Sequence, residues 1–344
     1  MYVPANRITI SFLALVLVSG ARTHGRAPPP SAPGLAVAAP TQRPATQAPP
    51  PARAARAVTR PLRAATRAAV APAEVARLLG ALADDSLEGR DTGSRGSAAA
   101  ARIIAAVLRQ AGVRPAGDSG YFQRVPLARF TVTDQGRPRT RVALLPDLAA
   151  RDTVAAENRL PFAAVNVLGV LPGREPRLRD EAIVVSAHYD HLGIGRPVNG
   201  DSIYNGAADD ASGTTAVLEV ARLLGRQRPA PRRTVVFLLA TGEERGMLGT
   251  RWYLNHPVVP LDHTVANLNV EMIARPDSLA GGPGKAWLTG FERSTMGPML
   301  REAGIPIVAD PRPEQHYFER SDNYPFARRG VVAHTLSSFG FHDD

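Results

Sequence analysis

Short runs of apolar residues alternate with amphipathic stretches along most of the chain from about residue 73. The runs are rich in β-branched residues and predict buried strands at 165–171, 183–186, 234–240, 266–270 and 330–336. Apolar residues recur at helical spacing over 73–82, 97–111, 214–224 and 246–254, which predicts helices there. In the second of these helices, Ile104 and Leu108 share one face, and Gly112 follows as a stop signal.

This order of elements predicts the class of fold. Strands that alternate with helices are typical of a largely parallel sheet with helices on both faces. We therefore expect an α/β protein, a three-layer α/β/α sandwich around a mixed, largely parallel central sheet. The sequence contains no internal repeat, so a single such domain is expected over residues 73–344.

The first 72 residues follow a different pattern. Arg7 precedes an apolar run, Ile8 to Val18, and Ser19-Gly20-Ala21 supplies the small residues of a cleavage site. This arrangement is typical of a secretory signal peptide over residues 1–21, with an apolar run too short for a comfortable membrane span. Residues 22–72 are rich in Pro, Ala and Arg, which predicts a disordered linker. The sequence thus predicts a secreted or periplasmic protein.

Charge is distributed unevenly along the chain. The formal net charge is +10, but nine of the 41 basic residues and none of the 31 acidic residues lie in residues 1–70. The rest of the chain is nearly neutral, which argues against a nucleic-acid partner, because such a partner requires a basic footprint on the folded domain. The basic tail is expected to associate weakly with anionic envelope surfaces. The chain has no cysteine, which excludes disulfides and lipid attachment through cysteine.

Residues suited to binding metal recur where the predicted strands end. These are His188 and Asp190, Asp209 and Asp210, Glu243 and Glu244, and Glu271. Because loops at the carboxyl ends of strands converge in an open α/β sheet, we expect these side chains to meet. Imidazole and carboxylate groups together are the ligands of a zinc site with hydrolytic potential.

Two of these pairs consist of adjacent acids, so the two carboxylates of a pair can have different roles. Asp209 and Asp210 precede a predicted helix, so one carboxylate can face the site while the other faces elsewhere; by themselves they could equally be helix caps. Glu243 and Glu244 allow one glutamate to bind metal while the other remains free as a base.

The ordered motifs resemble the family of dinuclear zinc exopeptidases that contains bacterial leucyl aminopeptidase, aminopeptidase Y and glutamate carboxypeptidase. They are His188-x-Asp190, Gly206-Ala-Ala-Asp-Asp-Ala-Ser-Gly213, Gly242-Glu-Glu244 and Asn269-Val-Glu-Met272. Further similar stretches are Asp85 to Arg90, Thr92 to Ser94, Gly120 to Gln123, Asn166-Val167 and Ser321 to Phe326. The resemblance therefore extends over residues 73–344.

The resemblance implies a role for each matched residue. His188 and Glu271 would bind a first zinc ion, Glu244 a second, and Asp209 would bridge the two. Glu243 would be the catalytic residue, acting as general base and then general acid.

It also implies two supporting acids beside the ligands. Asp190 would accept the other ring N–H of His188. Asp210 would follow the bridging residue, and the peptide bond between Asp209 and Asp210 would be cis.

The sequence departs from the family pattern in two places. Glu271 stands where the family more often has Asp, with the same ligand chemistry. The family's last ligand is a His in a Tyr-His pair that follows a segment similar to Ser337 to Asp344, where the sequence stops. We therefore expect a domain truncated at its C-terminus and two zinc ions, the second in an incomplete site. His342 is a candidate substitute ligand.

The other histidines carry no pattern that indicates a ligand. His191, His256, His263 and His316 have no recognisable partner, although His316 stands near Tyr317 in a loop that could border a substrate pocket. His334 lies on a predicted strand and is expected in the core or close to the site.

The function expected from the resemblance is a secreted zinc-dependent aminopeptidase that hydrolyses N-terminal bonds of peptides with metal-activated water. Alternatives are a glutaminyl cyclase or carboxypeptidase on the same fold, and a non-catalytic envelope binding protein. The free base Glu243 argues against the binding protein. A serine hydrolase is disfavoured because no Gly-x-Ser-x-Gly sequence is present.

Overall fold

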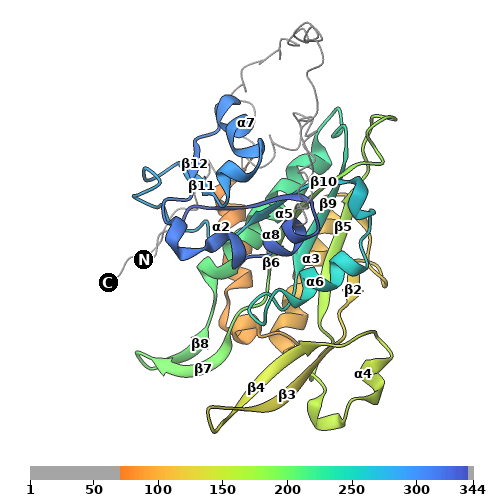
Figure 1. Cartoon of the computed structure of the whole chain (residues 1–344), viewed down its shortest axis with the longest axis vertical. Coiled ribbons are helices and arrows are strands. Elements are labelled where there is room, and N and C mark those ends of the chain that lie inside the picture. The colour runs from red at the N-terminus through yellow and green to blue at the C-terminus, as the bar shows by residue number, and fades with distance from the viewer. Residues whose placement is uncertain (1–69, 340–344) are drawn as a thin grey trace, which may run out of the picture.

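The computed structural model describes residues 70–339, so the predicted signal peptide, residues 22–69 of the predicted linker and His342 lie outside the described residues. The described chain forms a nine-stranded sheet in the order β1-β5-β9-β6-β10-β13-β11-β12, with β2 paired to β5. Helices cover both faces of this sheet (Figure 1), which confirms the predicted α/β sandwich. Among the described residues, no helix has the length and apolar content needed to span a membrane.

The strands of the main sheet are β1 (Arg114–Pro115), β2 (Phe122–Arg124), β5 (Val165–Leu171), β6 (Ala182–His188), β9 (Thr234–Ala240), β10 (Thr264–Val270), β11 (Ala286–Leu288), β12 (Ile307–Ala309) and β13 (Val332–Ser337). Five of them, β5, β6, β9, β10 and β13, follow the predicted apolar runs, whereas the short strands β1, β2, β11 and β12 were not predicted. The central strands β9, β6, β10 and β13 are mutually parallel. On either side, β5 and β11 pair antiparallel to the central strands, which makes the sheet mixed.

Helices pack on the sheet in two groups. On one face lie α2 (Pro72–Leu82), α3 (Arg95–Gln110) and α5 (Ser212–Arg226), with α5 in contact with both α2 and α3. On the other face lie α6 (Leu248–Asn255) and α8 (Asn323–Arg328). Two short helices, α4 (Ala150–Thr153) and α7 (Met296–Glu302), lie toward the periphery. Helix α6 begins two residues later than predicted, because Met247 adopts a left-handed conformation with φ of 57°.

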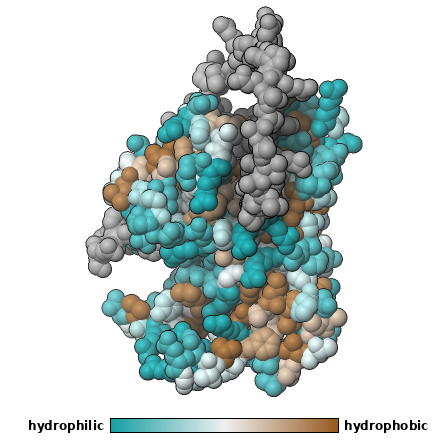
Figure 2. Space-filling model, viewed as in Figure 1, coloured by the Kyte–Doolittle hydropathy of each residue, from teal (hydrophilic) through white to brown (hydrophobic). Residues whose placement is uncertain are grey.

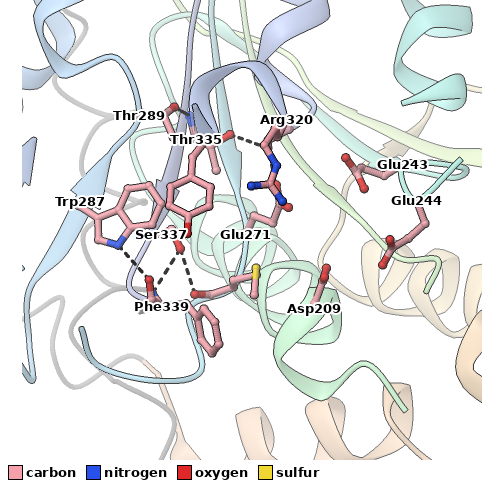
Figure 3. Close-up of a pocket in the computed structure, with 13 residues that line it drawn as sticks. Asp209, Glu243, Glu244, Glu271, Trp287, Thr289, Arg320, Thr335, Ser337 and Phe339 are labelled. Carbon is pink, nitrogen blue, oxygen red and sulfur yellow. Dashed lines mark hydrogen bonds between the residues drawn. The ribbon is translucent and has the colours of Figure 1, made fainter. Parts of the chain in front are cut away.

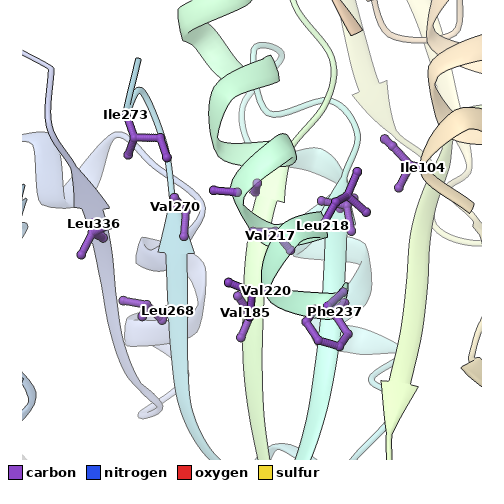
Figure 4. Close-up of a cluster of buried hydrophobic side chains, with 14 of the residues drawn as sticks. Ile104, Val185, Val217, Leu218, Val220, Phe237, Leu268, Val270, Ile273 and Leu336 are labelled. Carbon is purple, nitrogen blue, oxygen red and sulfur yellow. The ribbon is translucent and has the colours of Figure 1, made fainter. Parts of the chain in front are cut away.

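Side chains of the central strands alternate between the two faces and build two apolar clusters. In β9, Phe237 faces α5, whereas Val236 and Leu238 face α6 and α8. Figure 4 shows the first cluster, in which Val217 and Val220 of α5 lie over the strands. Because each strand is buried on both faces, its sequence is continuously apolar, which is why these strands were predictable.

Two hairpins extend from the body of the molecule (Figure 1) and were not predicted. They are β3 (Leu127–Asp134) with β4 (Arg137–Leu144), and β7 (Gly193–Val198) with β8 (Asp201–Tyr204). Figure 2 shows hydrophobic side chains exposed among hydrophilic ones at this end of the molecule. In the second hairpin, Ile194 and Val198 are 61% and 58% exposed, so no buried face reveals this hairpin in the hydrophobic pattern.

Candidate metal centre

Three of the predicted site residues stand at one edge of the central sheet. His188 is the last residue of β6, Glu271 directly follows β10, and Glu243 follows β9 by three residues. These strands are parallel neighbours, so their carboxyl ends meet at the same edge. Asp209 reaches this edge from the loop before α5. The structure therefore brings together side chains that are up to 83 residues apart in the sequence.

His188, Asp209 and Glu271 form a first cluster. Nε2 of His188 lies 3.1 Å from Oδ1 of Asp209 and 3.7 Å from Oε1 of Glu271. Two atoms bound to one tetrahedral zinc at about 2.0–2.2 Å are about 3.3–3.6 Å apart, so this spacing fits a common cation. The His188 side chain is fully buried, and Thr214 Oγ1 donates to its main-chain oxygen at 2.7 Å.

Glu271 is held from its second carboxylate oxygen. Ser321 Oγ donates to Oε2, and Asn269 Nδ2 donates to the same oxygen at 3.2 Å. Asn269 Nδ2 also donates to Ser321 Oγ at 2.9 Å, so the two polar side chains support each other. This leaves Oε1 of Glu271 directed at the cluster.

Asp209 and Asp210 face different directions, and the peptide bond between them is cis, as the resemblance implies. Oδ1 of Asp210 accepts from the main-chain N–H groups of Gly213 and Met272 at 2.9 and 3.1 Å. The Asp210 side chain thus ties the start of α5 to the chain after β10. Gly213 is required for this approach, since a Cβ there would lie 2.1 Å from the Val270 carbonyl oxygen.

Asp190 lies beneath the cluster, but its closest contact with the His188 ring differs from the predicted one. Nδ1 of His188 is 3.2 Å from the main-chain oxygen of Asp190 and 3.8 Å from its carboxylate. A carbonyl oxygen only accepts, so Nδ1 carries the hydrogen and Nε2 faces the cluster. The Asp190 carboxylate instead accepts from Thr92 Oγ1 at 3.0 Å and from the Glu243 N–H at 3.2 Å.

A second cluster adjoins the first and shares Asp209. Its other members are Glu244, as predicted, and His191, which was not predicted as a ligand. Nδ1 of His191 lies 2.7 Å from Oε1 of Glu244, and one ligand atom from each of the three residues lies within 4.8 Å of the other two. Their side chains are 11% (His191), 17% (Glu244) and 33% (Asp209) exposed.

The donor atoms of both clusters fit a bound cation. Four of them are buried and without a hydrogen-bond partner: His188 Nε2, His191 Nδ1, Asp209 Oδ1 and Glu244 Oε1. Leaving polar atoms buried and unsatisfied is costly, so their convergence indicates a ligand that satisfies them together. Imidazole nitrogen and carboxylate oxygen are the donors that zinc prefers.

Burial and mutual charge perturb the acids and the histidine of the site. Burial by itself lowers the pKa of His188, but the nearby Asp209 and Glu271 carboxylates raise this pKa well above its ordinary value. Burial raises the pKa of Glu243 well above its ordinary value, and the Glu271 charge adds to this. Burial likewise raises the pKa of Asp322, behind the site, to about 7. Such concentrated perturbation is typical of functional sites.

Arg90 fastens the loop that carries Asp209 to the rest of the domain. Its buried guanidinium donates to main-chain oxygens of Tyr189 at 2.7 Å, Asn205 at 2.6 Å and Gly206 at 2.9 Å, and also to that of Leu82. Burial lowers the pKa of Arg90 to about 10, opposed by the nearby acids of the site. The side chain therefore stays charged at neutral pH and supplies a cation below the acidic cluster.

A cavity of about 180 Å³ opens beside the clusters. Figure 3 shows Asp209, Glu243 and Glu244 on one side of it and Trp287 and Phe339 on the other, with Arg320 between. Tyr317 also lines the cavity, whereas the neighbouring His316 is not among the lining residues. The cavity is thus lined by carboxylates on one side and by aromatic side chains on the other.

The remaining histidines lie away from the clusters. His334 is buried and contacts Ser294 and the Thr289 carbonyl, as expected for a core residue; His256 stacks on Trp252. His263 and His316 are exposed. Sequence reasoning missed His191, whose only signal was its position three residues after His188. It also missed Ser321 and Thr92 as supports of the site, although both lay in motifs that carried the resemblance.

Comparison with known proteins identifies the family. A model of peptidase family M28 matches residues 166–344, which is more than half of the chain and includes both clusters. The chain belongs to peptidase family M28. This match confirms the predicted resemblance to a peptidase family.

Individual relatives agree with this assignment. A vacuolar membrane protease of Phaeosphaeria nodorum is 34% identical over 97 residues, 28% of this chain and 9% of the relative. A probable zinc metalloprotease of Pyricularia oryzae is 33% identical over 132 residues, 38% of this chain and 24% of the relative. The chain therefore matches less than a quarter of the length of these two proteins.

Solved structures agree on the fold. A zinc aminopeptidase from Bacillus subtilis superposes with a TM-score of 0.50 and 14% sequence identity, over 77% of this chain and 84% of that one. At this identity the likeness establishes the shared α/β fold.

The expected localisation needs correction. The chain was predicted to be secreted or periplasmic, but several curated relatives are named vacuolar membrane proteases. The prediction relied on the apolar run near the N-terminus, which lies outside the described residues and does not by itself identify a destination.

Proposed function

We propose that this protein is a zinc-dependent aminopeptidase. The observation that carries the proposal is the convergence of His188, Asp209 and Glu271 at one sheet edge, with Glu243 beside them and a cavity opening onto all of these acids. A non-catalytic binding protein would have no need of a partly buried acid next to the ligand set.

The metal sites are assigned to residues as follows. His188, Asp209 and Glu271 would hold one zinc ion, and Asp209 and Glu244 would contribute to a second. Zinc held by these residues would lower the pKa of a bound water and polarise the carbonyl of the peptide bond.

Glu243 is the proposed catalytic residue. Its N–H group donates to the Asp190 carboxylate at 3.2 Å, which fixes the main chain from which its side chain reaches the cavity. Burial raises its pKa well above that of an ordinary glutamate, so its carboxylate can take a proton from water and release it to the leaving amine.

The cavity favours a substrate with a free amino group. Four carboxylates line it, from Asp209, Glu243, Glu244 and Glu271. A protonated α-amine is attracted to such a wall, whereas a blocked N-terminus is not. Trp287 and Tyr317, with ring centroids 5.5 Å apart, offer an apolar surface to the side chain of the first residue.

Hydrolysis of matched peptides tests this proposal. The protein is stripped with a chelator, reloaded with zinc, and given a peptide with a free N-terminus and the same peptide N-acetylated. We expect zinc to restore cleavage of the first bond of the free peptide only. Cleavage of the acetylated peptide at an equal rate, or activity without zinc, would contradict the proposal.

A carboxypeptidase is the second candidate, and Arg320 favours it. Arg320 is the only cationic residue among those that line the cavity in the described part of the chain, and its guanidinium lies 5.4 Å from the centroid of the Tyr317 ring. A guanidinium there could pair with a terminal carboxylate. Release of the last residue from the acetylated peptide, lost in an Arg320→Gln variant, would favour this activity over the aminopeptidase.

A further inference from the structure

His191 occupies a position that the proposed roles leave unexplained. It follows β6 by three residues, and its ring faces Glu244 rather than solvent. Nδ1 of His191 and Oε1 of Glu244 lie 2.7 Å apart, yet neither atom has a partner with hydrogen-bond geometry. Oδ1 of Asp209 is also buried and unsatisfied, and a carboxylate oxygen of Asp209 lies within 4.8 Å of a ligand atom of each of these two residues.

We propose that His191 is a metal ligand, which binds through Nδ1 and completes the site formed by Asp209 and Glu244. The inference rests on the proposed zinc-dependent function. It differs from the family pattern described above, in which the last ligand is a histidine of a Tyr-His pair far along the chain. His191 instead stands in the loop that follows the first ligand strand.

The chemistry of the three donors suits a catalytic zinc. Zinc that acts in hydrolysis is held by three protein ligands and keeps a position open, and one imidazole with two carboxylates is such a set. Among the described residues, the second cluster would without His191 offer only two ligands, Asp209 and Glu244, both carboxylates. With it, each cluster contains one histidine, one private glutamate and the shared Asp209.

The surrounding chain restricts the His191 ring. The His191 N–H donates to the Arg90 carbonyl oxygen at 3.3 Å. Gly206, at φ of 60°, brings the main chain against the ring so closely that a Cβ there would lie 2.6 Å from His191 Cγ. The Arg90 guanidinium holds the Gly206 carbonyl oxygen at 2.9 Å. The ring is therefore confined between two segments that Arg90 joins.

Without a metal, these atoms permit a different role. The His191 ring could instead pair with Glu244 and simply orient its carboxylate. The two roles differ in a measurable way, because a ligand is required for the cation to bind with normal affinity, whereas an orienting partner changes that affinity less.

Zinc binding by the full 344-residue protein distinguishes these roles. Metal-stripped wild-type protein, His191→Ala and the matched control His263→Ala are titrated with zinc chloride by calorimetry, and bound zinc is counted after dialysis. His263 is an exposed histidine with no metal-binding neighbours in the two clusters, so its loss controls for removal of any imidazole. Circular dichroism confirms that each variant is folded.

We expect two zinc ions on the wild type and on His263→Ala, and one on His191→Ala. Loss of a residue that only supports a ligand lowers metal affinity by about 10- to 100-fold. In His191→Ala we expect the zinc affinity of the second site to fall by more than this. Adding Glu244→Ala to His191→Ala should remove no further zinc, because both changes affect one site. A His191→Ala protein that binds two zinc ions with wild-type affinity overturns the inference. So does a wild type that binds a single ion which His191→Ala retains.

A measurement on unaltered protein covers the case in which His191→Ala does not fold. Wild-type protein labelled with ¹⁵N-histidine is titrated with zinc, and the ring nitrogens are followed by NMR, with His191→Gln used for assignment. A shift of His191 Nδ1 as the second equivalent binds supports the inference, and an unchanged Nδ1 overturns it. A wild type that binds no zinc overturns the proposed function itself, which separates the two failures.

Discussion

The two clusters share Asp209 but are supported differently. In the first, His188 ends a buried strand and Glu271 directly follows another, and Ser321 and Asn269 fix the Glu271 carboxylate. In the second, His191 and Glu244 stand in loops and are partly exposed. Ligands at strand ends are held in place by the sheet, whereas ligands in loops depend on the segments that pack against them.

The spacing of the donor atoms reflects this difference. The His188 pairs, at 3.1 and 3.7 Å, are close to the separation of about 3.3–3.6 Å expected for two ligands of one tetrahedral zinc. The His191–Glu244 pair, at 2.7 Å, must open to admit a cation between its atoms. The first cluster is preorganised, and the second must adjust. We therefore expect the first to bind zinc more tightly.

The largest effect is expected for Glu243, the proposed catalytic residue, whose loss should lower activity without removing zinc from either cluster. Glu243→Gln should lower the rate of peptide hydrolysis by about 10²- to 10⁴-fold, because the proton carrier is lost while the ligands remain. Zinc content, measured by atomic absorption, should stay unchanged. The matched variant Glu244→Gln should lose zinc. If Glu243→Gln loses zinc and Glu244→Gln does not, the two roles are reversed.

Removal of the shared residue should abolish the difference between the clusters. Asp209→Ala should weaken zinc binding at both sites by more than about 100-fold, since each site loses a ligand. Loss of a residue that only supports a ligand already lowers metal affinity by about 10- to 100-fold. Glu271→Ala and Glu244→Ala should each weaken a single site. Zinc titrations of the three variants provide the comparison. An Asp209→Ala protein that keeps one site intact would show that Asp209 belongs to only one cluster.

Loss of a support should affect the first cluster alone. Ser321→Ala removes the hydrogen bond to Oε2 of Glu271, and we expect first-site zinc affinity to fall by about 10- to 100-fold. Ser278→Ala, at an exposed serine, is the control. Equal titration curves for Ser321→Ala and Ser278→Ala would show that this hydrogen bond does not position the ligand.

The smallest expected effect tests the packing around the second cluster. Gly206→Ala and its control Gly200→Ala both place a side chain at positive φ, which costs about 1–2 kcal/mol of stability. Only at Gly206 does the new Cβ meet His191 and the Asp209 carbonyl oxygen; at Gly200 it meets nothing within 4 Å. Second-site affinity should therefore fall in Gly206→Ala and not in Gly200→Ala. Equal affinity in both would mean that the ring is not confined there.

The first cluster lies at strand ends and the second in loops, and this difference explains which site residues the sequence could predict. β6 and β9 were recognised because continuous apolar runs are typical of strands buried on both faces, and their ends located His188 and Glu243. His191 could not be assigned, because its approach to Glu244 depends on how Gly206 and Arg90 fold the intervening loop. That arrangement produces no period in the sequence.

The Asp190 carboxylate illustrates a second limit. The resemblance correctly placed this acid beside His188, but not the atom that faces the ring, since the main-chain oxygen is 0.6 Å closer to Nδ1 than the carboxylate. Such a choice between two acceptors of one residue depends on local torsion angles. The hairpins were missed for a different reason, because strands exposed to solvent lack the buried face that reveals β6 and β9.

The hydrogen bonds of the Arg90 guanidinium limit where the domain can be cut. The family match begins at residue 166, and that portion contains every candidate metal ligand in the described chain. Yet the loop before Asp209 is fastened by a side chain from residue 90, and the α5 helix packs against α2 and α3. A fragment cut at residue 166 would carry all the ligands and lack their anchor. We therefore expect the smallest autonomous unit of this chain to reach back to α2, well upstream of residue 166.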